Sequence, residues 1–165
     1  MKKKRKIHKG GRPRRRPDRT DPTPETAAKL QPNVLTTLLH DSIITGEQHA
    51  AAEEIAGVWQ ALSRSLTARS AAADLIRQYG QSPDPFGLMN SDEIWRWQKR
   101  YKPWANGQSK KIVSRRPPLC RFRLTLKVAA DNMWPLLVSV RHQVPLGETV
   151  DALRDALDAY ILVKK

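Results

Sequence analysis

The sequence predicts a mainly α-helical protein, in which a small helical domain follows a disordered basic arm and ends in a C-terminal helical hairpin. Three observations support this fold class. Apolar residues recur at three- and four-residue steps over 45–66 and again over 148–163. A capping box stands where the first of these helices is expected to begin. Only residues 122–128 alternate apolar and polar side chains as a strand does, and that stretch can equally begin a helix.

The basic arm comprises residues 1–22. Its first twenty residues contain eleven Lys or Arg and one acid, Asp18. Almost no apolar residue accompanies these charges, and burying unpaired charges costs more free energy than folding returns. We therefore expect the arm to be disordered when free and to bind a polyanion.

The helical domain is expected over residues 23–101. Thr23-Pro24-Glu25 reads as an N-cap, a proline at the first helical position and an acid in the first turn, which predicts a short helix ending before Pro32. Apolar residues within 34–44 are spaced for a second helical face.

A capping box at Thr45–Gln48 predicts the start of the longest helix, which Gly80 and the prolines after it end. The following helix is expected to begin after Asn90 or Ser91. The interpretation thus places all of the long apolar faces before residue 101 on helices.

A basic linker is expected over residues 102–120, which are rich in Pro and Gly and poor in aliphatic residues. Residues 121–165 are expected to form the C-terminal helical hairpin. Its first helix lies within 133–144 and its second over 148–163, with a turn at 145–147.

The charges are segregated along the chain. Residues 21–93 carry four basic residues and ten acids, whereas residues 94–127 carry eleven basic residues and no acid. Residues 128–165 are nearly balanced, with four basic residues and five acids. This segregation indicates that the arm and the second basic stretch contact a polyanion while the other segments make the fold.

Gly11-Arg12-Pro13 lies inside the arm with basic residues on both sides. This core resembles the AT-hook, which lays an extended Arg-Pro backbone into the minor groove of A/T-rich DNA, where the potential is most negative. Contact with phosphates alone and a plain solubilising or targeting tail are the open alternatives, and Lys2–Lys6 also resembles a nuclear localisation signal. The predicted nucleic-acid-binding residues of the arm are Lys3, Lys4, Arg5, Lys6, Arg12, Pro13, Arg14, Arg15 and Arg16.

The second basic stretch interleaves aromatic residues with cations. Such a surface can stack unpaired bases, and Trp95 and Trp104 are the candidates for stacking. The alternative is that Trp97 and Tyr101 belong to the core while the cations face water. The predicted phosphate-binding residues of this stretch are Lys110, Lys111, Arg115, Arg116, Arg121 and Arg123.

No motif for catalysis is present. The sequence has no phosphate loop, nucleophile elbow or zinc-protease motif, and its one cysteine, Cys120, excludes an intrachain disulfide. Glu53 and Glu54 beside His49 are interpreted as a solvated helix face. No apolar run reaches the length of a membrane span. We expect a non-enzymatic protein without cofactor or metal that is cytoplasmic or nucleoid-associated, or nuclear in a eukaryote.

The last two predicted helices have the proportions of a helix-turn-helix. The exposed face of the second one carries Asp151, Asp155 and Asp158, with only Arg154 opposing them. Those acids would repel DNA, because a recognition helix normally presents Arg, Lys, Asn or Gln. We therefore expect this helix to contact a protein partner or a second copy of the chain.

Two segments carry a family resemblance. Thr23–Leu30 and Glu47–Ile55 resemble short helical proteins of alphaproteobacterial prophages and gene-transfer-agent-like clusters. Those proteins often close with a helix of the form Leu-Arg-x-Ala-Leu-Asp-x-Tyr, here within Leu153–Tyr160, which is similar to the helix-turn-helix region of sigma-like or antiterminator-like regulators. The resemblance implies a phage-type, non-enzymatic regulator or packaging accessory.

The leading prediction is a non-enzymatic DNA-binding protein, a transcription regulator of phage or prophage type that places its arm and its second basic stretch on duplex DNA. Two alternatives stay open. One is a DNA-packaging subunit similar to small terminase subunits, which would form a ring. The other is a structural protein that binds RNA.

Overall fold

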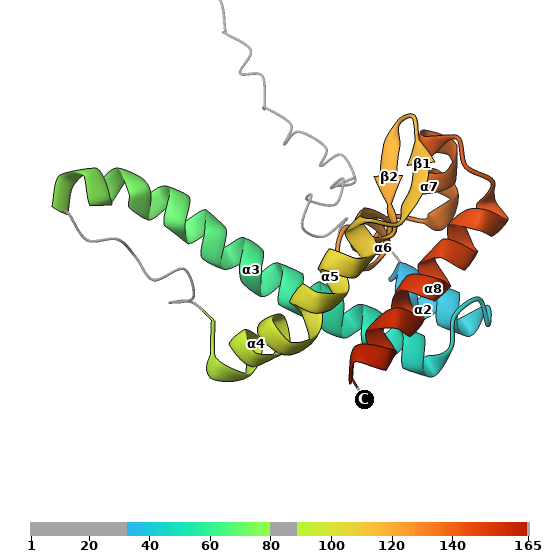
Figure 1. The fold of residues 1–165 in the computed structure, drawn as a ribbon, viewed down its shortest axis with the longest axis horizontal. Coiled ribbons are helices and arrows are strands. Elements are labelled where there is room, and N and C mark those ends of the chain that lie inside the picture. The colour runs from blue at the N-terminus through green and yellow to red at the C-terminus, as the bar shows by residue number, and fades with distance from the viewer. Residues whose placement is uncertain (1–32, 80–88, 165) are drawn as a thin grey trace, which may run out of the picture. The chain divides into compact units, whose positions relative to one another are not determined.

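The computed structural model describes the backbone of residues 33–79 and 89–164 and the side chains of residues 33–66 and 89–163. Helices predominate, and the described strands form one two-stranded antiparallel sheet, so the predicted mainly α-helical fold class is confirmed (Figure 1). The predicted basic arm and the short helix expected at 23–30 lie outside the described residues.

The first described helix, α2, spans Val34–His40, and its apolar face is buried as the sequence predicts. Both capping groups are asparagines. The Asn33 side chain accepts a hydrogen bond from the Leu35 N–H (3.0 Å), and Asn132, distant in sequence, accepts one from the Val34 N–H (2.8 Å). These bonds satisfy two of the N–H groups that a helix leaves free at its start.

The long helix α3 spans Gly46–Tyr79 and begins with the predicted capping box. The Thr45 N–H donates to Gln48 Oε1 (3.0 Å), and the Gln48 N–H donates to Thr45 Oγ1 (3.2 Å). The Gln48 side chain is itself buried and donates to Asp158 Oδ1 (2.7 Å). The cap therefore also joins α3 to the last helix.

A broken helix follows and turns back along α3. Helix α4 (Ser91–Arg96) starts at the Asn90–Glu93 capping box, continues as a π-helical turn (Trp97–Tyr101) and ends as α5 (Lys102–Ser109). The π turn ends at Tyr101, two residues before Pro103. Pro103 has no N–H to donate to the carbonyl four residues earlier. The Lys102 N–H donates instead to the Trp97 carbonyl, five residues earlier.

The predicted linker over 102–120 is wrong, because this stretch has regular structure. Its first half is α5, and its second half is a hairpin of β1 (Ile112–Arg115) and β2 (Pro118–Cys120). The register pairs Arg115 with Pro118 and Ile112 with Cys120, with an irregularity between Ile112 and Ser114. Pro103 stands in the first turn of α5 and Pro117 and Pro118 at the hairpin turn, whereas Gly107 lies inside α5.

Three helices complete the chain. The ambiguous stretch at 122–128 is helical, within α6 (Arg121–Ala129), and is followed by α7 (Pro135–His142) and α8 (Leu146–Lys164). The predicted pair of C-terminal helices is therefore present, and α8 begins inside the turn expected at 145–147. Leu124, Thr125 and Leu126 are buried in succession, which the alternating faces of a half-buried strand do not produce, and the Thr125 hydroxyl donates to the Arg121 carbonyl four residues earlier (2.9 Å), as in a helix.

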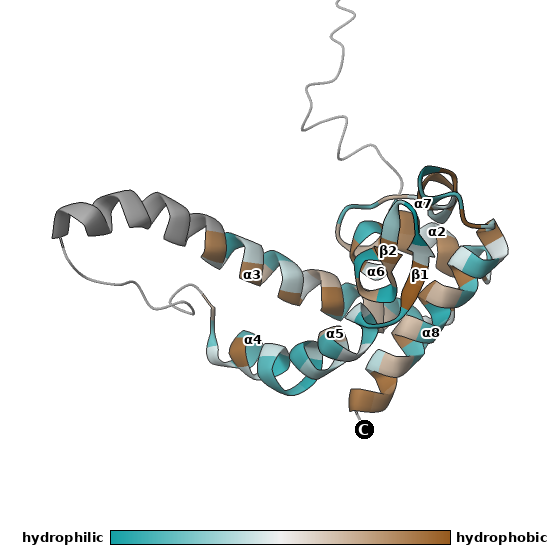
Figure 2. Cartoon of the chain, turned by 45° about the horizontal axis from the view of Figure 1, so that its top comes forward, coloured by the Kyte–Doolittle hydropathy of each residue, from teal (hydrophilic) through white to brown (hydrophobic). Residues whose placement is uncertain are grey.

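One continuous core joins these elements, from α2 and α3 to α5, α6 and α8. Trp104 lies within it against Tyr101, Phe122 and Tyr160, with ring centroids 5.6 to 5.8 Å from the Trp104 ring. Figure 2 shows hydrophobic residues along α7 and α8, whereas α4 and α5 are largely hydrophilic. The basic second stretch of the sequence therefore lies on the outside of a core that it helps to build.

Candidate nucleic-acid interface

The hairpin and the two helices beside it bring the predicted cations of the second basic stretch together. The hairpin base is closed by a hydrogen bond from the Arg121 N–H to the Lys111 carbonyl (2.9 Å). The tip carries the cis Arg116–Pro117 peptide. We call this group the hairpin cluster, and its members are Lys110, Lys111, Arg115, Arg116, Arg121 and Arg123.

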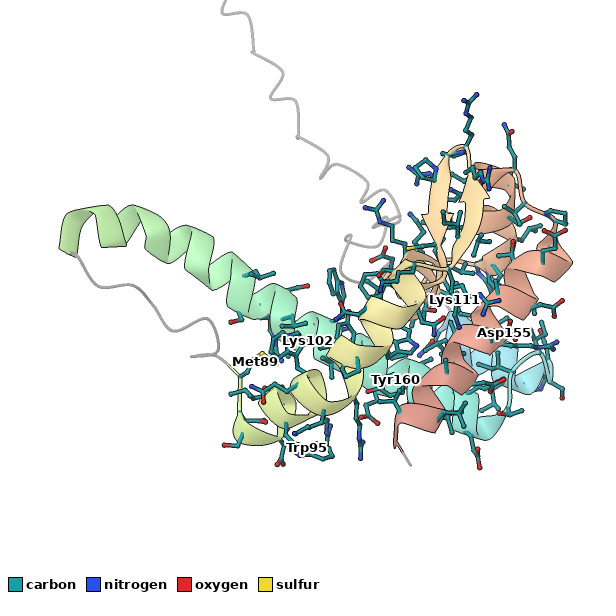
Figure 3. The ribbon with its side chains drawn as sticks, in the orientation of Figure 1. Met89, Trp95, Lys102, Lys111, Asp155 and Tyr160 are labelled. Atoms are coloured by element: carbon teal, nitrogen blue, oxygen red, sulfur yellow. The ribbon has the colours of Figure 1, made fainter. Side chains whose placement is uncertain are left out.

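Five members of the hairpin cluster are exposed and make no ion pair with another described residue. Arg121 differs, because its guanidinium lies 2.7 Å from Asp155 Oδ2 on α8. Figure 3 shows Lys111 at the foot of the hairpin and long side chains ending in nitrogen at its tip. The cluster therefore offers five exposed cations without ion pairs, on the hairpin and on the adjoining ends of α5 and α6, which is an arrangement suited to phosphate contact.

The hairpin is tied to α7 on one side. Ser114 Oγ donates to the His142 carbonyl (3.1 Å), and His142 Nδ1 lies 3.2 Å from the Pro117 carbonyl. A carbonyl only accepts, so Nδ1 carries the proton and donates. The His142 ring is buried, and its Nε2 has no partner among the described residues. These two bonds hold the arginine-bearing tip against a helix end instead of leaving it to move freely.

A groove of about 780 Å³ runs beside the hairpin. Its lining is mixed: Ile112, Leu119 and Phe122 supply apolar surface, and Arg115 and Arg123 supply charge. Cys120, the one cysteine of the sequence, also lines it and is partly exposed.

The two tryptophans predicted to stack on bases have different environments. Trp104 is only 2% exposed, and its Nε1–H donates to the Ala156 carbonyl (2.7 Å), so the prediction of a stacking role is wrong for Trp104. Trp95 is 48% exposed, with the Arg100 guanidinium 4.7 Å from its ring centre. Figure 3 places Trp95 on α4, far from Lys111, so the remaining stacking candidate is not part of the hairpin cluster.

The alternative interpretation, that Tyr101 and Trp97 belong to the core, is confirmed for Tyr101, which is buried. Trp97 is partly buried and packs against the core, and the Lys102 ammonium lies 5.3 Å from its ring centre. Arg100 was expected to face water. It instead reaches Glu54 Oε1 on α3 at 2.9 Å.

Glu54 was interpreted as part of a solvated helix face, and that interpretation is wrong. Its side chain is 14% exposed and accepts hydrogen bonds from Arg100 (2.9 Å) and from the Tyr160 hydroxyl (3.0 Å). Burial first, and then the Glu54 charge, raise the pKa of the Tyr160 phenol above its usual value, so this hydroxyl remains a donor. No periodicity in the sequence distinguished Glu54 from Glu53, because the distinction depends on what packs over α3.

The acidic face of α8 is exposed, as the sequence predicts, but each acid has a contact within the fold. Asp155 pairs with Arg121, Asp158 accepts from Gln48, and Asp151 lies 3.7 Å from Arg154. Any protein contact through this face would therefore compete with bonds that hold α8 to its neighbours.

Other kinds of site find no support in the described side chains. No group of three or more His, Cys, Asp or Glu there could hold a metal ion. None of the described helices combines the length and the apolar character needed to cross a membrane. The predicted arm residues, from Lys3 to Arg16, lie outside the described part of the chain.

Comparison of the chain with protein-family models, with curated proteins and with solved structures finds no match.

Proposed function

We propose that this protein is a non-enzymatic regulator that binds duplex DNA, with the hairpin cluster as the contact of the folded unit and the basic arm as a second contact. The observation that carries the proposal is the set of five exposed cations, without ion pairs among the described residues, on the hairpin tied to α7 and on the adjoining ends of α5 and α6. Cations that project from a fixed element meet phosphates with little further loss of conformational entropy.

The charge distribution supports DNA over an acidic protein partner. The cluster lies in a stretch of the sequence, residues 94–127, that contains no acid, and the first twenty residues contain one. Two basic segments flanking a mildly acidic helical segment suit a long polyanion, which can contact both at once.

The test measures the affinity of the full chain for a short duplex at several salt concentrations. Arg115→Gln/Arg116→Gln should lower the slope of log affinity against log salt by roughly two, since each lost phosphate contact changes it by about 0.9. The matched control is Arg96→Gln/Lys99→Gln, which removes the same charge from exposed positions at the other end of the unit. Equal slopes for the two variants would mean that net charge, and not the hairpin, determines binding.

The arm proposal has its own test. If Arg12 enters the minor groove, Arg12→Ala should reduce the preference for A/T-rich over G/C-rich duplexes, while Lys3→Ala should weaken binding to both about equally. Equal losses for Arg12→Ala on both duplexes would reduce the arm to a nonspecific tether.

Two further measurements separate the alternatives. Tighter binding to structured RNA than to duplex DNA at the same salt would favour the RNA-binding alternative. A ring-sized mass in light scattering would favour the DNA-packaging alternative.

A further inference from the structure

The groove beside the hairpin contains more apolar surface than phosphate contact requires. Ile112 is 67% exposed on β1, and it lines the groove together with Arg115 and Arg123. Phe122 also lines the groove and is partly buried, with its ring edge-on to Trp104 at 5.8 Å and to Tyr101 at 6.2 Å. These ring contacts fix Phe122 from behind, so its groove-facing side is a rigid apolar surface.

The cations are placed at the same groove. Arg115 from β1 and Arg123 from α6 both line it, and neither forms an ion pair with a described residue. Since β1 and α6 are joined at the hairpin base through the Arg121–Lys111 backbone bond, the two guanidinium groups approach the groove from different elements. A ligand that fits has an apolar body and anionic groups beside it.

A nucleotide with an unpaired base has this chemistry. Its flat base can lie against Phe122 and Ile112, and the phosphates on either side can reach Arg115 and Arg123. The groove volume of about 780 Å³ is within the range of ligand sites. The bases of an intact duplex are stacked on each other and cannot enter the groove. We propose that this groove holds one unpaired base of DNA, at an overhang or gap next to the duplex.

The proposal rests on the proposed function, because the remaining exposed cations of the cluster then contact the adjoining duplex. Lys110 and Lys111 precede β1 and Arg116 follows it, so the groove lies within a larger cationic surface. A surface of this kind favours a chain of phosphates over a short acidic peptide, which would bring few charges.

The first test compares the affinity of the full chain for a blunt duplex and for the same duplex with a short thymine overhang. The overhang should tighten binding by about fivefold or more, since one stacked base contributes about 1 kcal/mol or more. Ile112→Ser should remove most of this preference, with a smaller effect on the affinity for the blunt duplex. Val140→Ser, at an equally exposed apolar position on α7 outside the groove, should keep the preference.

The second test uses Cys120, because alkylation of the chain by iodoacetamide reports on this one thiol. The overhang duplex should slow alkylation several-fold more than the blunt duplex does. If an acidic peptide protects Cys120 and neither the blunt nor the overhang duplex does, the proposal is overturned in favour of a peptide site.

The outcomes separate the two proposals. The groove assignment would be overturned if the protein bound the blunt duplex with steep salt dependence but showed no overhang preference and no protection of Cys120. The proposal of DNA binding would then still stand. Absence of salt-dependent binding to either DNA would overturn the proposed function together with the groove. Because Ile112 is mostly exposed, both serine variants should melt within a few degrees of the parent protein.

Discussion

The hairpin cluster and the segment from α4 to α5 have similar compositions and opposite roles. Both draw their cations from the acid-free stretch at 94–127, and both combine cations with aromatic or apolar residues. In the α4–α5 segment, Arg100 pairs with Glu54 and Lys102 lies over Trp97, so these two charges serve the fold, while Arg96 and Lys99 are exposed. In the hairpin cluster, five of six cations have no such partner among the described residues. A basic aromatic segment therefore indicates a binding surface only after the internal partners of its cations are known.

The sharpest test of this comparison is the pair of tryptophans in the α4–α5 segment. Trp104→Ala should destabilise the protein by about 3–5 kcal/mol, because it removes a buried ring and its bond to the Ala156 carbonyl. Trp95→Ala should cost about 1 kcal/mol or less, since it loses an exposed ring and one contact with Arg100. Urea unfolding of both variants measures the difference, and similar losses would contradict the buried role of Trp104.

The second prediction concerns the carboxylate that binds Arg100. Glu54→Gln should destabilise the protein by about 1–3 kcal/mol, because it leaves a partly buried guanidinium without a charged partner. Glu53→Gln is the matched control. It lies on the same turn but its side chain is 58% exposed, so its effect should stay within about 0.5 kcal/mol. If the two variants unfold alike, Glu54 belongs to the solvated face after all.

The third prediction tests how the hairpin is held. Ser114→Ala removes the bond to the His142 carbonyl and should cost about 0.5–1.5 kcal/mol, with faster amide exchange in the hairpin. Ser109→Ala removes a local bond to the Asn106 carbonyl within the last turn of α5 and should leave hairpin exchange unchanged. Identical exchange in both variants would mean that the tip is held by other contacts.

The smallest effect is expected in alkaline solution. Burial raises the pKa of the Tyr101 and Tyr160 phenols in the folded protein above the usual tyrosine value of about 10. The unfolded chain then releases these protons first, so their contribution to stability is present below pH 10 and is lost as the pH rises above it. In a Tyr79→Phe variant, which removes the third tyrosine, phenolate absorbance should therefore appear together with unfolding. Both phenols ionising near pH 10 in the folded protein would contradict this.

The sequence alone predicted the local features of the fold. The Thr45–Gln48 capping box and the Asn90 cap were readable because capping depends on residues three positions apart. The exposed acids of α8 were readable from helical period. Local backbone bonding and side-chain period act over one or two turns, which is the range that a single sequence displays.

Tertiary structure decided the features that depend on distant partners. Whether 122–128 is strand or helix depended on the elements that pack over it, since α6 contacts α3 and α8 and buries Leu124, Thr125 and Leu126 in succession. Trp104 donates to the carbonyl of Ala156, which lies 52 residues away in the chain. Glu54 accepts from Arg100 and Tyr160, which lie 46 and 106 residues away from it. The free energy of a buried ring or carboxylate depends on what covers it, and sequence spacing does not contain that information. Five cations of the hairpin cluster are exposed and have no ion pair among the described residues, whereas Arg100 and Arg121 are paired within the fold.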